Sequence, residues 1–122
     1  MDLHAFLRWL DIIPGRGWLA LGPPALAETI WRDTRANAVT ERRPECPLEF
    51  PEGTFDVVVA ELSSADVELA REMRRVIWPS GTAGAYSQSL SAAELERLFR
   101  QAGLRAVQSA SLPGGVAVRG AR

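Results

Sequence analysis

The segment that decides the fold runs from Phe50 to Gly81 and reads FPEGTFDVVVAELSSADVELAREMRRVIWPSG. Within it, Phe55–Ala60 is an almost continuous apolar run with consecutive β-branched valines. Such a run is typical of a strand that is buried on both faces of a parallel sheet. Val67–Ile77 then places apolar residues at helical spacing, with charged residues on the opposite face. We therefore expect a buried strand followed by an amphipathic helix that covers the sheet.

Capping and breaking residues mark both ends of that helix. Ser63 or Ser64 can accept a hydrogen bond from the first free amides, and Asp66 suits the positive end of the helix dipole. Pro79 cannot continue a helix, so we expect the helix to end there and the chain to turn at Gly81. The segment therefore predicts one strand–loop–helix unit.

A second helix with clear ends is expected further along the chain, after a short strand. Thr82–Ser87 is a run of small residues that fits the strand. Ser91 and Glu94 have the spacing of a capping box, in which each side chain accepts a hydrogen bond from the other residue's amide. Gly103 stands where a glycine commonly follows a helix. The helix between these signals has an apolar stripe, so we expect it to pack on the sheet.

The N-terminal part predicts two short helices and two short strands. Residues 2–11 have apolar positions at helical spacing, and Pro14-Gly15 is expected to end this helix. Trp18–Leu21 fits a buried strand. Proline is tolerated in the first turn of a helix, so Ala25–Trp31 can follow as a helix. Asn37–Thr40 is the candidate for a second small strand.

The chain closes with a predicted antiparallel hairpin, because strands Arg105–Leu112 and Gly115–Arg119 flank a turn at Pro113-Gly114. Alternating strands and helices with a terminal hairpin favour an α/β layered fold. The chain has 122 residues, of which 47% are hydrophobic and 24% charged. This size and composition fit a single domain over residues 1–122.

The charge balance and the rare residue types argue against several functions. The net charge is −1 and all 14 basic residues are arginine, so nothing indicates a nucleic-acid partner. His4 and Cys46 are the single histidine and cysteine, which argues against a disulfide, a metal site, and Ser-His-Asp or Cys-His catalysis. Arg8 and Asp11 interrupt the apolar N-terminal segment, so we expect neither a signal peptide nor a membrane span. The expected location is the cytoplasm.

Three segments stand in a fixed order ahead of the closing hairpin: Phe50–Val59, Met73–Gly81 and Leu95–Leu104. In this order they resemble class I S-adenosylmethionine-dependent methyltransferases of the type 11 group. Phe50–Val59 is similar to the family's PF-x-D-G-S-F-D-x-V segment, and Met73–Gly81 to its R-V-L-K-P-G-G segment. Leu95–Leu104 is similar to E-L-x-x-L-L-x-x-A-G-F, and the closing hairpin completes the match. The resemblance implies a three-layer Rossmann-like methyltransferase fold with about six strands, mostly parallel, and a C-terminal antiparallel hairpin. We expect this chain to lack one helix-strand unit of that fold, because only Arg42–Glu49 remain where the family has a helix and a strand.

The resemblance also implies a cofactor site for S-adenosylmethionine and no metal. Gly22 matches the glycine-rich loop after the first strand, and Glu41 matches the carboxylate that binds the ribose hydroxyls. Leu48 is a further expected cofactor contact, and Glu45 is the acidic residue nearest to the expected adenine position. Glu61 follows the central strand and is the expected catalytic residue, an acid on the substrate side, because ligands collect at the carboxyl ends of strands.

The chain departs from the family at Pro23-Pro24, which stand where the family has glycines and supply no backbone N–H. Two functions therefore stay open. The first is a methyltransferase that acts on an unknown acceptor. The second is a catalytically inactive domain of the same fold that serves as an interaction or scaffolding module, as a homodimer or beside a partner protein. An exposed edge at Asn37–Thr40 would invite such pairing. A nicotinamide-binding domain is disfavoured, because no G-x-G-x-x-G follows Trp18–Leu21.

Overall fold

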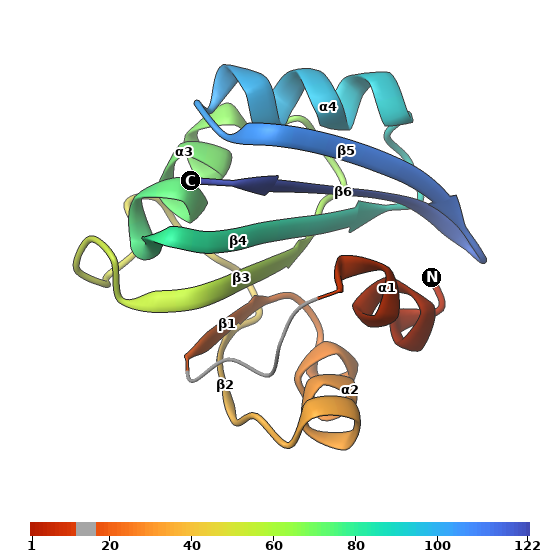
Figure 1. The fold of residues 1–122 in the computed structure, drawn as a ribbon, viewed down its shortest axis with the longest axis horizontal. Coiled ribbons are helices and arrows are strands. Elements are labelled where there is room, and N and C mark those ends of the chain that lie inside the picture. The colour runs from red at the N-terminus through yellow and green to blue at the C-terminus, as the bar shows by residue number, and fades with distance from the viewer. Residues whose placement is uncertain (12–16) are drawn as a thin grey trace.

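The computed structural model describes residues 1–11 and 17–122, which form one six-stranded sheet with helices on both faces (Figure 1). The helices are α1 (Leu3–Leu10), α2 (Pro24–Thr34), α3 (Val67–Val76) and α4 (Ala92–Gln101). The strands are β1 (Trp18–Leu21), β2 (Ala38–Glu41), β3 (Phe55–Glu61), β4 (Ile77–Ser87), β5 (Arg105–Leu112) and β6 (Gly115–Ala121). The expected helix end at Pro14-Gly15 lies outside the described residues.

The sheet has the strand order β2-β1-β3-β4-β6-β5. The first four strands in this order are parallel to one another, and β6 is antiparallel to both β4 and β5. The mostly parallel sheet with a C-terminal antiparallel hairpin confirms the predicted fold class. Because β2, β1, β3 and β4 run the same way, their carboxyl ends lie along one edge of the sheet, where ligands of open α/β sheets bind.

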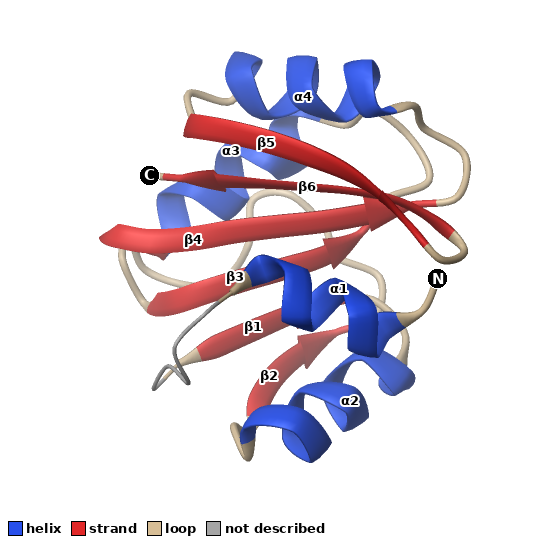
Figure 2. Cartoon of the chain, turned by 45° about the vertical axis from the view of Figure 1, so that its right-hand side comes forward, coloured by secondary structure: helices blue, strands red, loops and turns tan. Residues whose placement is uncertain are grey.

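Neighbouring residues of the inner strands point to opposite faces and form two hydrophobic cores. On one face, Trp18 and Val57 pack with the apolar residues of α1 and α2. On the other, Leu19 and Val58 pack with those of α3 and α4. Figure 2 shows α1 in front of the sheet and α3 behind it. This double burial explains why β1 and β3 are apolar throughout.

The helix ends follow local chemistry, with one difference from the expectation. The N-cap of α3 is Asp66, whose Oδ1 accepts a hydrogen bond from the Leu69 amide at 3.1 Å, so the cap expected at Ser63 or Ser64 lies further along the chain. The capping box of Ser91 and Glu94 at the start of α4 is confirmed. Gly103 follows α4 with φ of +90°, a conformation that favours glycine.

Strand β4 begins earlier than the sequence predicts. It starts directly after α3 at Ile77, where we expected Pro79 to end the helix and Gly81 to turn the chain. The pairing with β3 steps from Phe55↔Ile77 to Val57↔Thr82, so β4 advances five residues against two in β3. The extra residues form a bulge, and residues in a bulge are not paired with the neighbouring strand. Pro79 has no N–H to donate, but at this position no ladder hydrogen bond is lost, which explains how it fits inside a strand.

A short connection replaces a helix-strand unit between β2 and β3. In this connection Leu48 is buried and Phe50 is half-buried, and both pack against the core below α3. Strand β2 is consequently an edge strand, and Val39 on it is 45% exposed. The prediction of a missing unit is confirmed, and the open edge follows from it.

Candidate functional site

Two cavities meet at the carboxyl ends of the parallel strands. The first, here called the arginine cavity, has a volume of about 420 Å³. Its lining includes Gly22, Pro23, Arg42, Arg43, Glu61 and Asp66. The second, the tyrosine cavity, has a volume of about 300 Å³. Its lining includes Met1, Leu3, Pro23, Glu61, Tyr86 and Ser89. Pro23 and Glu61 border both cavities, so Glu61 stands at the junction between them.

A third cavity lies under the connection that follows β2. This loop cavity, with a volume of about 440 Å³, is lined by Glu41, Arg43, Glu45, Cys46, Pro47, Leu48, Glu49 and Phe50. Arg43 lines both the arginine cavity and the loop cavity. The two cavities are therefore neighbours that share the Arg43 side chain.

The amino end of α2 closes one side of the arginine cavity but offers few hydrogen-bond donors. The first four amides of a helix lack partners within the helix and are the usual anion-binding groups. Here Pro23 is the N-cap and Pro24 is the first helical residue, so two of these four donors are absent. The Leu26 amide donates to the Pro23 carbonyl at 3.0 Å. Ala25 supplies the remaining amide.

Glu61 and Tyr86 form a polar pair at the ends of β3 and β4. They are direct partners in the sheet, and the Tyr86 hydroxyl donates a hydrogen bond of 3.0 Å to Glu61 Oε2. Tyr86 is buried, whereas Glu61 is exposed to the cavities. Burial, followed by the nearby Glu61 carboxylate, raises the pKa of Tyr86 far above its ordinary value. The phenol therefore stays protonated and holds the Glu61 carboxylate in place.

Gly22 lies beside Glu61 at the end of the neighbouring strand β1. A Cβ atom at Gly22 would lie 3.4 Å from both the Glu61 Cβ and a Leu26 methyl carbon. The end of β1 thus lies within van der Waals distance of the end of β3. The sequence placed Gly22 and Glu61 at one site, and the structure brings them together on the wall of the arginine cavity.

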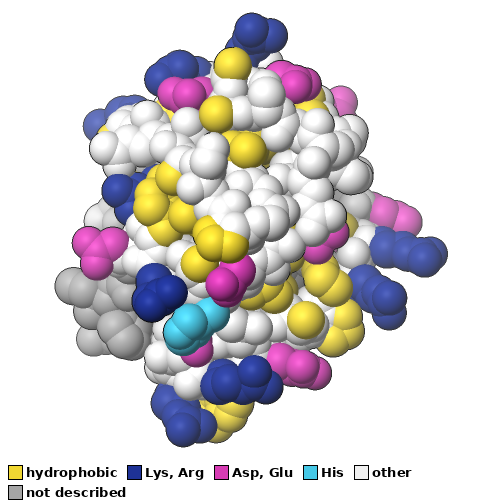
Figure 3. Space-filling view, turned by 90° about the vertical axis from the view of Figure 1, so that its right-hand side faces the viewer, with side chains coloured by type: hydrophobic (Ala, Val, Ile, Leu, Met, Phe, Trp, Pro, Cys, Tyr) yellow, Lys and Arg dark blue, Asp and Glu magenta, His cyan; other side chains and the backbone are white. Residues whose placement is uncertain are grey.

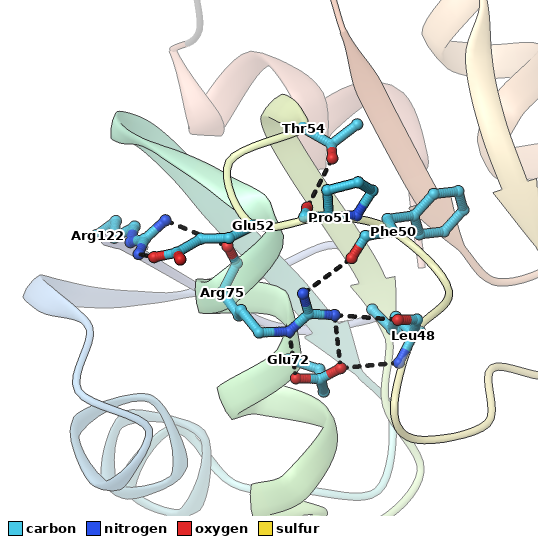
Figure 4. Close-up of polar contacts among 8 residues, drawn as sticks. All are labelled: Leu48, Phe50, Pro51, Glu52, Thr54, Glu72, Arg75 and Arg122. Carbon is cyan, nitrogen blue, oxygen red and sulfur yellow. Dashed lines mark hydrogen bonds and ion pairs between the residues drawn. The ribbon is translucent and has the colours of Figure 1, made fainter.

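Glu41 and Leu48 lie together in the loop cavity. Glu41 is the last residue of β2 and is exposed. Leu48 is 5% exposed, and its backbone is fixed: its N–H donates to Glu72 at 2.8 Å and its carbonyl accepts from Arg75 at 3.0 Å (Figure 4). Glu45 is exposed in the same cavity.

The sequence reasoning did not assign a site role to Tyr86 or to the two arginines that follow β2. The pairing of Tyr86 with Glu61 depends on the register of β3 with β4. Arg42 and Arg43 belong to a segment that reads as a loop of mixed charges. The sequence does contain one signal for them: the two arginines are adjacent and directly follow a strand whose carboxyl end lies at the edge of the sheet where ligands bind.

The surface around the site carries charges of both signs. The right-hand side of Figure 1, toward which β4 runs, faces the viewer in Figure 3, where acidic, basic and apolar side chains are all present. Within residues 1–11 and 17–122 there is no group of three His, Cys, Asp or Glu side chains that could hold a metal ion. In the same residues no helix is long and apolar enough to cross a bilayer.

Comparison with known proteins identifies the fold. No protein-family model matches the sequence, and no curated protein matches it. Among solved structures, PigF with SAH superposes with a TM-score of 0.78 at 13% identity, over 98% of this chain and 54% of that one. A SAM-dependent methyltransferase from Thermotoga maritima superposes with a TM-score of 0.67 at 14% identity, over 98% of this chain and 87% of that one.

A third similar structure contains a complex between the Haloferax volcanii Trm112 methyltransferase activator and a methyltransferase. It superposes with a TM-score of 0.61 at 18% identity, over 88% of this chain and 72% of that one. The chain spans about half the length of PigF and most of the length of the Thermotoga protein. At these identities the comparisons show the fold, which is that of class I S-adenosylmethionine-dependent methyltransferases.

Proposed function

We propose that this protein binds S-adenosylmethionine at the carboxyl ends of β1, β2 and β3 and transfers its methyl group to an acceptor in the tyrosine cavity. The observation that carries the proposal is the meeting of two cavities at Glu61, on the edge where open α/β sheets bind ligands. One cavity can take the cofactor and the other the acceptor, with the reacting atoms at the junction. The methyltransferase fold supports the same assignment.

The residues of the arginine and loop cavities fit the cofactor with an altered set of donors. Each cavity has a volume within the range of roughly 300–1,000 Å³ that is usual for small-molecule sites. In the proposed mode Gly22 lets the ligand approach the end of β1, and the Glu41 carboxylate accepts hydrogen bonds from the ribose hydroxyls. Leu48 supplies an apolar contact for the adenine. Because Pro23 and Pro24 have no backbone N–H, other groups must bind the amino-acid end of the cofactor.

The bound cofactor would supply a methyl group on a positively charged sulfur, which an acceptor displaces in line. Such a displacement depends mainly on the positions of the reactants. Glu61 would act on the acceptor side, where its carboxylate holds a cationic acceptor or takes the proton that the acceptor loses. The Tyr86 hydroxyl keeps that carboxylate pointed at the junction of the two cavities.

A ligand-induced shift in stability tests the cofactor site. S-adenosylhomocysteine at about a hundred times its Kd should stabilise the fold by about 2.7 kcal/mol. The shift should shrink in Glu41→Ala and persist in Glu28→Ala, which removes an exposed carboxylate from α2, outside the cavities. Thermal unfolding with and without ligand measures both effects. If the wild-type protein shows no shift at millimolar ligand, the proposal is wrong.

A second candidate function is an inactive interaction module that forms a homodimer or binds a partner protein in the cytoplasm. Two observations favour it: the amide donors missing at Pro23 and Pro24, and the open edge of β2 with the exposed Val39. Val39→Lys would place a charge on this edge and disrupt pairing. Light scattering after size exclusion tests the candidate, which fails if the wild-type chain is monomeric at every concentration and binds S-adenosylhomocysteine.

A further inference from the structure

We propose that Arg42 and Arg43 form the binding site for the carboxylate of an α-amino acid group in the arginine cavity. The inference rests on the proposed function, in which this group is the amino-acid end of the cofactor. In this inference, side chains of the β2–β3 connection bind the carboxylate, because Pro23 and Pro24 supply no backbone amides for it. Neither the fold nor the resemblance to a family points to these two residues.

The shortened connection after β2 brings the two arginines to the site. Strand β2 ends at Glu41, and the chain turns at once toward Leu48, which is anchored below α3 by Glu72 and Arg75. Arg42 and Arg43 therefore stay at the carboxyl edge of the sheet, where both line the arginine cavity. Arg43 lies between the arginine cavity and the loop cavity, where a ligand that also reaches Glu41 would pass it.

Both guanidinium groups are available to a ligand. Within residues 1–11 and 17–122, the side chains of Arg42 and Arg43 make no hydrogen bond or ion pair. Other arginines are engaged: Arg75 bonds Glu72 and two loop carbonyls, and Arg119 bonds Gln108 and the Trp9 carbonyl. A guanidinium offers donors in a planar fork that matches a carboxylate, and both side chains line the arginine cavity.

The charges around the cavity favour an amino acid over a simple anion. Glu61 and Asp66 line the same cavity as the two arginines. A phosphate group bound by the arginines would face these carboxylates at a cost, because like charges repel. An α-amino acid presents its carboxylate and its ammonium group side by side, so each end meets the opposite charge. The mixture of two basic and two acidic side chains therefore fits a zwitterion.

The closing experiment compares ligands with and without an amino-acid group. Calorimetry gives the Kd of S-adenosylhomocysteine, and of 5′-methylthioadenosine, which lacks the amino-acid end, for the wild type and for Arg42→Ala/Arg43→Ala. We expect the double variant to weaken S-adenosylhomocysteine at least about tenfold, the worth of one lost charged hydrogen bond, and to leave 5′-methylthioadenosine unchanged. Arg32→Ala, an exposed arginine of α2 outside the cavities, should change neither value.

The outcomes separate this inference from the proposed function. If the wild type binds both ligands and the double variant weakens them equally or not at all, the arginine site is wrong and the cofactor site stands. If the wild type binds neither ligand, the proposed function is wrong, and the binding of free L-methionine, followed by NMR, decides the arginine site. Loss of L-methionine binding in the double variant then supports it, and no binding by the wild type overturns it. Matching thermal midpoints without ligand show that the variants fold.

Discussion

The side chains of Glu72 and Arg75, one turn apart on α3, hold the β2–β3 connection against the helix. Arg75 Nε donates to Glu72 Oε2 at 2.7 Å, while its two terminal nitrogens donate to the carbonyls of Phe50 and Leu48 at 2.8 and 3.0 Å (Figure 4). Glu72 Oε1 also accepts from the Leu48 amide at 2.8 Å. One ion pair thus fixes both the carbonyls and an amide of a segment that lacks regular structure.

The first prediction concerns the stability that this pair provides. Arg75→Met removes the donors of two loop carbonyls and leaves Glu72 without its cation. We expect a loss of about 1–3 kcal/mol in the free energy of unfolding, because the variant loses several part-buried hydrogen bonds, each worth about 0.5–1.5 kcal/mol. Urea denaturation measures it. Arg71→Ala, an exposed change on the same helix, should stay within about 0.5 kcal/mol. Equal effects of the two substitutions would show that the pair does not anchor the connection.

The second prediction concerns acid. The hydrogen bonds from Arg75 lower the pKa of Glu72 below its ordinary value of 4.5. A carboxylate with a lowered pKa in the folded state stabilises the fold above its unfolded pKa, and this contribution is lost as the pH falls through the folded pKa. Glu72→Gln should therefore cost stability at pH 7 and much less in acid below the folded pKa. Denaturation curves across the acid range check it, and a constant gap between variant and wild type would contradict it.

The third prediction uses Tyr86, the single tyrosine of the chain. Its pKa is raised from the ordinary value of 10.0, first by burial and then by the Glu61 carboxylate. Because the folded state favours the protonated phenol, its contribution is complete below the unfolded pKa and declines as the pH rises past that value. Tyr86→Phe should cost about 0.5–1.5 kcal/mol at pH 7 through the lost hydrogen bond, and the gap should close above pH 10.

The absorbance of tyrosinate gives a direct readout for Tyr86. In the folded protein the signal should stay absent at pH values where the urea-unfolded chain already shows it in full. No other tyrosine can contribute. If the folded protein titrates together with the unfolded chain, the phenol is not the fixed donor to Glu61 that the structure shows.

The fourth prediction tests the donors lost at the start of α2. Pro24→Ala restores an amide at the first helical position, next to the arginine cavity. We expect S-adenosylhomocysteine to bind about fivefold more tightly, since one added hydrogen bond is worth about 1 kcal/mol. The variant should lose about 0.4–1 kcal/mol of stability, because proline restricts the unfolded chain. Calorimetry and urea denaturation measure the two effects, and unchanged affinity would place the ligand away from this helix end.

The sequence predicts those parts of the fold that depend on neighbouring residues. Two predictions rest only on the spacing of nearby residues, and both are confirmed. They are the capping box of Ser91 and Glu94 and the strand at Trp18–Leu21. The start of β4 at Ile77 could not be predicted in this way, because it depends on pairing with Phe55 across the sheet. A proline signals the end of a helix, but it does not show whether a bulged strand begins there.

The site is less predictable than the fold, because cavities form between segments that are distant in the sequence. Gly22 and Glu61 could be placed together, since each lies at the carboxyl end of a predicted parallel strand. The part that Arg42 and Arg43 play depends on where the connection goes after β2, and that path is set by Glu72 and Arg75 on another element. Tyr86 meets Glu61 only through the register of β4, which the bulge shifts.

The last prediction tests that bulge. A Cβ atom at Gly81 would lie 2.7 Å from the Asp56 carbonyl oxygen and 3.0 Å from that of Trp78, and both contacts are with backbone that cannot easily move. Gly81→Ala should therefore cost about 1–3 kcal/mol, the usual penalty of overpacking. Gly17→Ala is the matched control, since its Cβ would meet nothing closer than 3.7 Å and the Gly17 amide would still donate to Asp56. Urea denaturation of both variants should show a large loss only for Gly81→Ala. Similar values for the two would mean that β3 and β4 can separate at the bulge without cost, and that the register joining Glu61 to Tyr86 is set elsewhere in the sheet.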